Sequence, residues 1–126
     1  MAGAPVVLIV DDDAAIRALL RELLHEAGYA SLEAAEGLEA IRLLEDDALR
    51  ARICLVLLDL NMPRADGIAV LQHLAAGRRM VPVVAMSANI GQLLEARRLG
   101  VAAALEKPFE LDTLLALVGR LCGDPS

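Results

Sequence analysis

The sequence predicts an α/β fold in which a doubly wound parallel sheet carries helices on both faces. Short apolar runs that suit buried strands occur five times, and segments with apolar residues at helical spacing lie between them. Strands that alternate with helices favour parallel βαβ units. At 126 residues the chain has the usual size of one domain, so we expect residues 1–126 to form a single domain.

The first strand and the first helix are well delimited. Val6–Val10 is an aliphatic run typical of a buried strand, and three aspartates follow it directly. Apolar residues then recur at helical spacing up to Ala27, with Asp13 as the expected N-cap and Gly28 as the residue that ends the helix. Because one cap uses one side chain, two of the three aspartates have no such explanation.

The next segments predict an edge strand, a helix and the central strand. Tyr29–Ala35 is less apolar and is expected near a sheet edge, and Gly37 begins a second helix that contains Leu44. The polar residues 46–52 are expected to be a linker. Ile53–Leu58 is apolar throughout, as in a strand buried on both faces.

The second half of the chain repeats the alternation. A third helix ends at Gly77, and Gly100 is the expected C-cap of a short fourth helix. The remaining expected elements are the strand Met80–Met86, the helix Leu93–Leu99, the strand Val101–Leu105 and the helix Leu111–Cys122. The expected total is five strands and five helices.

Chemically active side chains follow four of the five strands. They are Asp11 and Asp12 after the first, Asp59 after the third, Ser87 after the fourth and Lys107 after the fifth. Each has an ordinary explanation when taken alone, as a cap or a turn residue; Ser87, for example, could cap the next helix. Since ligands of open α/β sheets bind at the carboxyl ends of the strands, the combination predicts a site there.

This set of residues suits phosphoryl chemistry. Carboxylates about 4 Å apart repel by about 4 kcal/mol at an effective dielectric near 20, so a cluster favours a hard cation such as Mg²⁺ or Mn²⁺. A carboxylate can also act as a nucleophile and form an aspartyl phosphate. The metal and Lys107 would then stabilise charge on the transferred group, and the Ser87 hydroxyl could donate to a phosphoryl oxygen.

Composition excludes several other classes of protein. The net charge of −6 argues against a nucleic-acid surface, and no apolar stretch reaches the roughly 18 residues that span a bilayer. The N-terminus lacks the pattern of a secretion signal, so we expect a cytoplasmic protein. Cys54 and Cys122 are expected to be separate core or helix residues, neither a disulfide nor a metal pair.

Four motifs, "LIVDDD", "LVLLDLNMPRADG", "MSAN" and "EKPF", resemble the CheY-like response-regulator receiver family of two-component signalling, and the similarity runs from Val6 to about Leu121. The resemblance implies a flavodoxin-like sheet of order 2-1-3-4-5. It also implies a phosphohistidine donor on a histidine kinase or a histidine phosphotransfer domain. Output would leave through the fourth helix, fifth strand and fifth helix toward a downstream protein target.

The resemblance also implies a role for each site residue. Asp59 is the phosphoacceptor and a metal ligand; Asp12 binds Mg²⁺ directly, Asp11 binds it mainly through water, and Asn61 offers its backbone carbonyl. Ser87 matches the switch hydroxyl, and Lys107 matches the lysine that pairs with the phosphate.

Two features depart from the family pattern. Ala104 stands where receivers usually carry Tyr or Phe, three residues before the lysine, and the segment from Ser87 to Lys107 is about two residues shorter than usual. Both lie on the expected output face. We therefore hypothesise that the signal leaves by movement of the backbone and the fourth helix, without an aromatic rotamer switch.

The sequence leaves an alternative and argues against two others. A phosphorylation-independent interaction module with the same fold is the second hypothesis, supported by Ala104. A phosphatase with an aspartyl nucleophile commonly carries a second aspartate two positions on, where this chain has Asn61. A flavin-binding protein would carry a phosphate-binding loop rich in Ser, Thr and Gly after the first strand, where this chain has three aspartates. We expect the chain to catalyse only its own phosphorylation and dephosphorylation, and not to be an enzyme with an external substrate.

Overall fold

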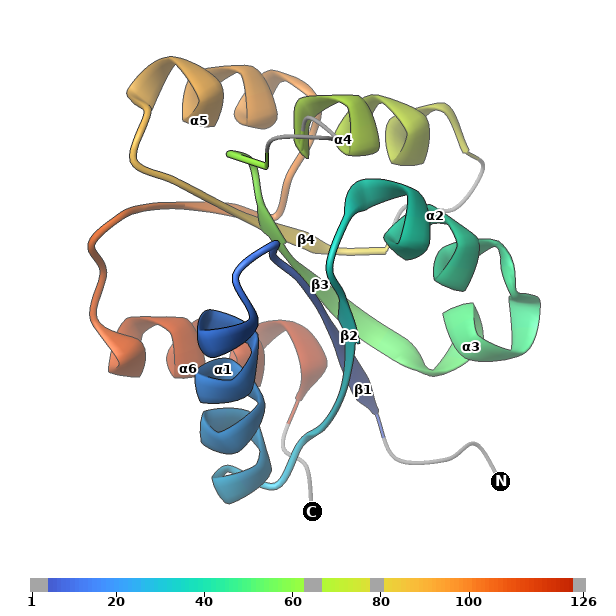
Figure 1. The fold of residues 1–126 in the computed structure, drawn as a ribbon, viewed down its shortest axis with the longest axis vertical. Helices are drawn as coiled ribbons and strands as arrows, with labels where there is room; N and C mark the ends of the chain where they lie inside the picture. The colour runs from blue at the N-terminus through green and yellow to red at the C-terminus, as the bar shows by residue number, and fades with distance from the viewer. Residues whose placement is uncertain (1–4, 63–66, 78–80, 124–126) are drawn as a thin grey trace.

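The computed structural model describes residues 5–62, 67–77 and 81–123, and its centre is a five-stranded parallel sheet of order β2-β1-β3-β4-β5 (Figure 1). The strands are β1 (Val6–Val10), β2 (Ala30–Ala34), β3 (Ile53–Asp59), β4 (Val83–Ser87) and β5 (Ala103–Glu106). The fold class and the strand order are confirmed. The less apolar second strand lies at an edge, as predicted, and β3 lies at the centre.

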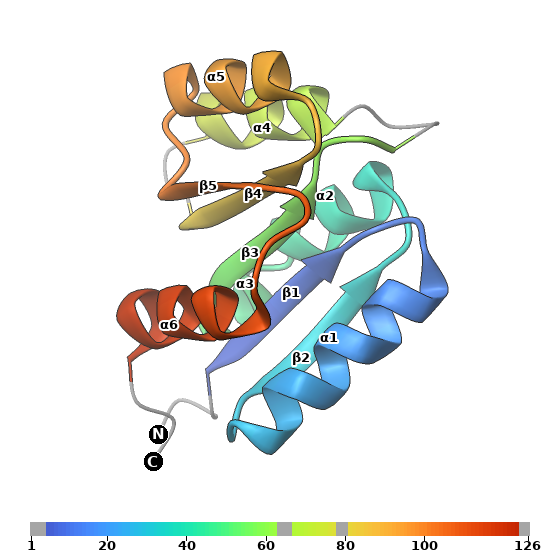
Figure 2. The same cartoon turned by 90° about the vertical axis from the view of Figure 1, so that its left-hand side faces the viewer.

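Helices cover both faces of the sheet. They are α1 (Ala14–Glu26), α2 (Gly37–Glu45), α3 (Asp47–Arg52), α4 (Gly67–Ala76), α5 (Ile90–Arg98) and α6 (Leu111–Cys122). The helices α1 and α6 lie on one face, and α2, α4 and α5 lie on the other (Figure 2). Among the residues described, no helix is long and apolar enough to span a membrane.

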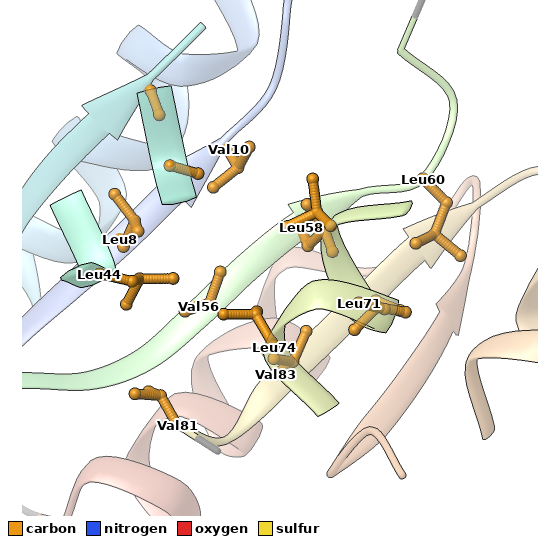
Figure 3. Packing of buried hydrophobic residues seen from close by; sticks show 14 of the residues in the cluster. Leu8, Val10, Leu44, Val56, Leu58, Leu60, Leu71, Leu74, Val81 and Val83 are labelled. Carbon is orange, nitrogen blue, oxygen red and sulfur yellow. The ribbon is translucent and has the colours of Figure 1, made fainter. Parts of the chain in front are cut away.

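Two hydrophobic layers follow from the alternation of side chains along each strand. In β1, Val7 and Ile9 face α1 and α6, whereas Leu8 and Val10 face α2 and α4. Figure 3 shows the second layer, in which Leu8 and other strand residues meet the helices. Burial on both faces explains why the central strands read as continuous apolar runs.

Residues Asp47–Arg52 form the helix α3, so the prediction of a linker over 46–52 is wrong. Asp46 caps α3, because its carboxylate accepts a hydrogen bond from the Leu49 N–H at 3.1 Å. An ion pair of 2.7 Å joins Arg50 to Asp47 within it. None of the residues of α3 is buried. A helix that is held by its cap and by local pairs leaves no apolar periodicity to recognise.

Several predicted boundaries move by a few residues. α5 begins at Ile90 and not at Leu93, since Asn89 is the N-cap. Gly28 and Gly100 both have positive φ, 93° and 91°, and each lies one residue beyond the C-cap of its helix, Ala27 for α1 and Leu99 for α5. The prediction that Gly28 ends α1 is confirmed, whereas the C-cap of α5 is Leu99 and not Gly100. The predicted start of the fourth strand at Met80 lies outside the described residues.

Cys54 and Cys122 form a disulfide, which corrects the prediction of separate core residues. Cys54 is near the start of β3 on the face toward α6, and Cys122 is the last residue of α6. Their sequence separation is 68 residues, and they meet because α6 returns across the sheet to β3. Beside the disulfide, the Tyr29 hydroxyl donates to the Gly123 carbonyl at 2.8 Å. The end of α6 is therefore held at two places.

Candidate functional site

Three carboxylates meet where β1 and β3 end. Asp11 directly follows β1, and Asp59 is the last residue of β3, the neighbouring strand. One oxygen from each of Asp11, Asp12 and Asp59 lies within 4.8 Å of the other two. Asp11 is 1% exposed and Asp59 is 4% exposed, whereas Asp12 is exposed. The carboxylates that were predicted to converge at the carboxyl ends of these strands therefore do so.

The surroundings of Asp11 fit a cation. Its Oδ1 accepts a hydrogen bond from the Asp13 N–H at 2.9 Å, and its Oδ2 is buried without a hydrogen-bond partner among the described residues. Burial raises the pKa of Asp11 above its ordinary value, and the charge of Asp59 raises it further, against the lowering effect of the Asp13 hydrogen bond. An unpaired buried oxygen within a carboxylate cluster is well suited to a hard divalent ion.

Arg17, which no sequence pattern indicated, holds the loop after β1 that carries Asp11 and Asp12. Its guanidinium donates to the Asp11 carbonyl at 2.7 Å and pairs with Glu33 on β2 at 3.2 Å. Arg21 pairs with the same glutamate at 3.0 Å. The signal that could have revealed Arg17 is the position of Glu33 on the strand beside β1, which requires the strand order.

Lys107 reaches the site from the loop after β5. Its Nζ lies 3.4 Å from Asp59 Oδ1, which also accepts a hydrogen bond from the Asn61 N–H at 3.0 Å. The Lys107 N–H donates to the Ser87 carbonyl at 2.9 Å, so the end of β4 holds the start of this loop. The predicted lysine and the predicted nucleophile are thus brought into contact.

Ser87 is 1% exposed at the end of β4, and its hydroxyl contacts α5. Oγ donates to Gln92 Oε1 at 2.6 Å and accepts from the Asn89 N–H at 2.9 Å. The structural alternative for Ser87, an N-cap, is wrong because the Asn89 side chain caps α5 by accepting from the Gln92 N–H at 3.1 Å. Gln92 is a second residue at the site that no sequence pattern indicated.

The backbone below the site is tightly packed against α4. A Cβ atom added at Gly67, the first residue of α4, would lie 2.5 Å from Leu60 Cα and 2.7 Å from the Asp59 carbonyl oxygen. Since real Cβ atoms do not approach so closely, only glycine allows α4 to begin here.

An apolar groove of about 450 Å³ opens beside the site. Asp11 and Lys107 are the charged residues of its lining. Its apolar lining comes from α1, the end of β4 and the segment that leads into α6: Ile16, Leu19, Leu20, Met86, Ala88, Pro108, Phe109 and Leu111.

Fold and site together define an α/β domain with a carboxylate cluster and a lysine at the carboxyl ends of its parallel strands. The family model of the response regulator receiver domain matches residues 7–119, and the chain therefore belongs to the response regulator receiver family. Members of this family are phosphoacceptor signalling modules and not true enzymes, so the phosphatase alternative is excluded. The acidic triad Asp11, Asp12 and Asp59 is typical of the receiver Mg²⁺ site.

Individual relatives agree with this assignment. The chain is 36% identical over 110 residues to sporulation initiation phosphotransferase F of Bacillus subtilis, and the aligned region covers 86% of each of the two chains. It is 39% identical over 115 residues to the transcriptional regulatory protein PdtaR of Mycobacterium tuberculosis, covering 89% of this chain and 54% of the relative. A crystal structure of a response regulator receiver protein from Pseudomonas putida has a TM-score of 0.84 at 29% identity and covers 95% and 99% of the two chains.

The relatives differ in how much of their length is matched. The chain spans most of the Bacillus protein but only about half of several mycobacterial regulators. The match therefore supports the assignment of this chain as a receiver domain. It says nothing about the activities of the other parts of those regulators.

Proposed function

We propose that this chain accepts a phosphoryl group on Asp59 and changes its contacts with a protein target as a result. The observation that carries the proposal is the geometry around Asp59: two further carboxylates lie within 4.8 Å, and the Lys107 ammonium lies 3.4 Å away. In the transfer, an Asp59 oxygen forms a bond to phosphorus while the bond from phosphorus to the donor nitrogen breaks. The donor imidazole is the leaving group.

Each residue has a proposed part in this step. Asp12 and Asp59 would bind Mg²⁺ directly, Asp11 would bind it mainly through water, and Asn61 would offer its backbone carbonyl. The ion, when bound, supplies positive charge for the oxygens of the transferring group. The Lys107 ammonium exchanges its ion pair with Asp59 for one with the phosphoryl group, and the Ser87 hydroxyl donates a hydrogen bond to a phosphoryl oxygen.

The proposed donor is a phosphohistidine on a histidine kinase or a histidine phosphotransfer domain. The Bacillus relative is named a phosphotransferase, and receiver domains imply such a partner. The groove supports this, because Asp11 and Lys107 belong both to its lining and to the site around Asp59, so a protein that presents a histidine to Asp59 would lie beside the groove. We place this exchange in the cytoplasm.

The proposed output surface is the face of α5, β5 and α6. Ile90 and Leu94 on α5 are both 59% exposed, the largest exposure of any large apolar side chain among the described residues, which suits contact with a protein. Ala104 on β5 is half-buried beneath this face. The hypothesis of a signal relayed by α5 without an aromatic rotamer remains a prediction.

A mass measurement tests the proposal. With Mg²⁺ and acetyl phosphate, the intact chain should gain one phosphoryl group, and Asp59→Asn or removal of the metal should prevent the gain. Beryllofluoride, a phosphoryl mimic, covers the case of rapid hydrolysis. If neither reagent modifies or binds the parent chain in the presence of Mg²⁺, the phosphorylation-independent interaction module becomes the better account.

A further inference from the structure

The Ser87 hydroxyl has one proton, and that proton forms a hydrogen bond to a side chain of α5. It is donated to Gln92 Oε1 at 2.6 Å, while Oγ accepts from the Asn89 N–H at 2.9 Å. Ser87 is 1% exposed, so bulk water does not compete for the hydroxyl. A serine hydroxyl offers a single donor, and a second acceptor can be served only after the first is released.

These contacts form an extended helix cap. In a capping box, the side chain of the third helical residue bonds directly to the N–H of the N-cap residue. Here Asn89 is the N-cap of α5 and Gln92 is the third helical residue, but the Ser87 hydroxyl lies between them. The other half of the box is intact, since Asn89 Oδ1 accepts from the Gln92 N–H at 3.1 Å.

This arrangement connects α5 with the phosphoacceptor. Asp59 on β3 lies opposite Met86 on the neighbouring strand β4, and Ser87 is the next residue of β4 after Met86. A phosphoryl oxygen on Asp59 that takes the Ser87 proton deprives Gln92 of its donor. The Asn89 N–H can keep its hydrogen bond to Oγ, so the Gln92 side chain is the group in the first turn of α5 that loses its partner.

We propose that Gln92 is a positioning residue that holds the Ser87 hydroxyl proton on α5, so that occupancy of Asp59 by a phosphoryl group must break the Ser87–Gln92 hydrogen bond. The inference rests on the proposed function, since Gln92 affects the site only through that proton. It also supplies a route to the exposed Ile90 and Leu94 that needs no aromatic residue at position 104.

The experiment measures beryllofluoride affinity with saturating Mg²⁺ by calorimetry on the full chain. Gln92→Met keeps the length of the side chain and removes the acceptor, so binding should tighten about threefold to tenfold, the usual range for one hydrogen bond. Gln92→Glu supplies a charged acceptor, which holds the proton more firmly and should weaken binding by a similar factor. Arg97→Ala, at an exposed position on the same helix, is the matched control and should leave the affinity within twofold.

The same substitutions in a Ser87→Ala background separate the hydrogen bond from any other effect. Without the hydroxyl, Gln92→Met should have no effect, and only a direct charge effect of Gln92→Glu should remain. Equal affinities for the parent and Gln92→Met, or a Gln92→Met effect that persists without Ser87, overturn the proposal for Gln92 and leave phosphorylation of Asp59 intact. Failure of the parent chain to bind beryllofluoride overturns both.

Discussion

Asp11 is suited to bind a cation, and its charge destabilises the folded chain when no cation is bound. Its carboxylate is 1% exposed, and one oxygen has no partner among the residues described. Because its pKa is raised in the folded chain, protonation of Asp11 favours the folded state. The stability that this protonation provides is complete below the ordinary pKa of the group and is lost as the pH rises through the raised pKa.

Asp11→Asn should therefore stabilise the metal-free protein at neutral pH, by about 1 kcal/mol, since it removes a buried charge close to Asp59. The difference in unfolding free energy between the variant and the parent should shrink as the pH falls through the raised pKa of Asp11. Urea unfolding at several pH values in the presence of a chelator measures it. A variant that is less stable than the parent at pH 7 without metal contradicts this account.

Gly67 is the residue on which the close approach of α4 to the site depends. Gly67→Ala should lower the unfolding free energy by about 2 kcal/mol, because the new Cβ overlaps the Leu60 backbone. Gly119→Ala is the matched control: its Cβ would be 3.8 Å from the Tyr29 hydroxyl, and alanine favours the helix α6. Thermal unfolding should show opposite shifts, and equal shifts for both variants would be inconsistent with the packing.

At the scale of elements, the disulfide ties β3 to the end of α6. Loop-closure entropy assigns such a bond about 4 kcal/mol for a loop of this length. A reductant should therefore lower the melting temperature of the parent chain and leave a Cys54→Ser/Cys122→Ser variant unchanged. In the cytoplasm the pair would be held reduced, so the cytoplasmic form is expected to be the less stable dithiol.

Alkylation followed by intact mass measurement checks the pairing itself. The purified, air-oxidised protein should take up no alkylating groups after unfolding, and two after unfolding with a reductant. Two reactive thiols in the air-oxidised protein would show that Cys54 and Cys122 are not joined.

For the molecule as a whole, binding of Mg²⁺ to the acidic triad would be linked to folding. A ligand that binds only the folded chain stabilises the folded state by about 2.7 kcal/mol when its free concentration is about a hundred times its Kd. Mg²⁺ should therefore raise the melting temperature of the parent chain, whereas Asp12→Asn should lose most of the rise. Sodium chloride at equal ionic strength is the control, and an equal rise with either salt would indicate screening of the charge of −6 in place of a metal site.

Much of this molecule could be predicted from short-range patterns. Alternation of apolar runs, the cap at Asp13 and the glycines that end helices indicate the elements, and polar residues at strand ends indicate the site. α3 was missed because it buries no side chain. The Cys54–Cys122 and Arg17–Glu33 pairs were missed because each depends on which elements become neighbours in the folded chain.

The position of the disulfide also determines how the chain would respond to a mechanical force. A pull applied at the two ends cannot extend the segment between Cys54 and Cys122, and that segment is more than half of the 126 residues. Held between two handles, the oxidised molecule should lengthen on rupture by less than half as much as the reduced one, at about 3.6 Å per released residue. β1 and β2 lie outside the closed ring and would be stripped from the sheet, while the ring from β3 onward stays covalently closed.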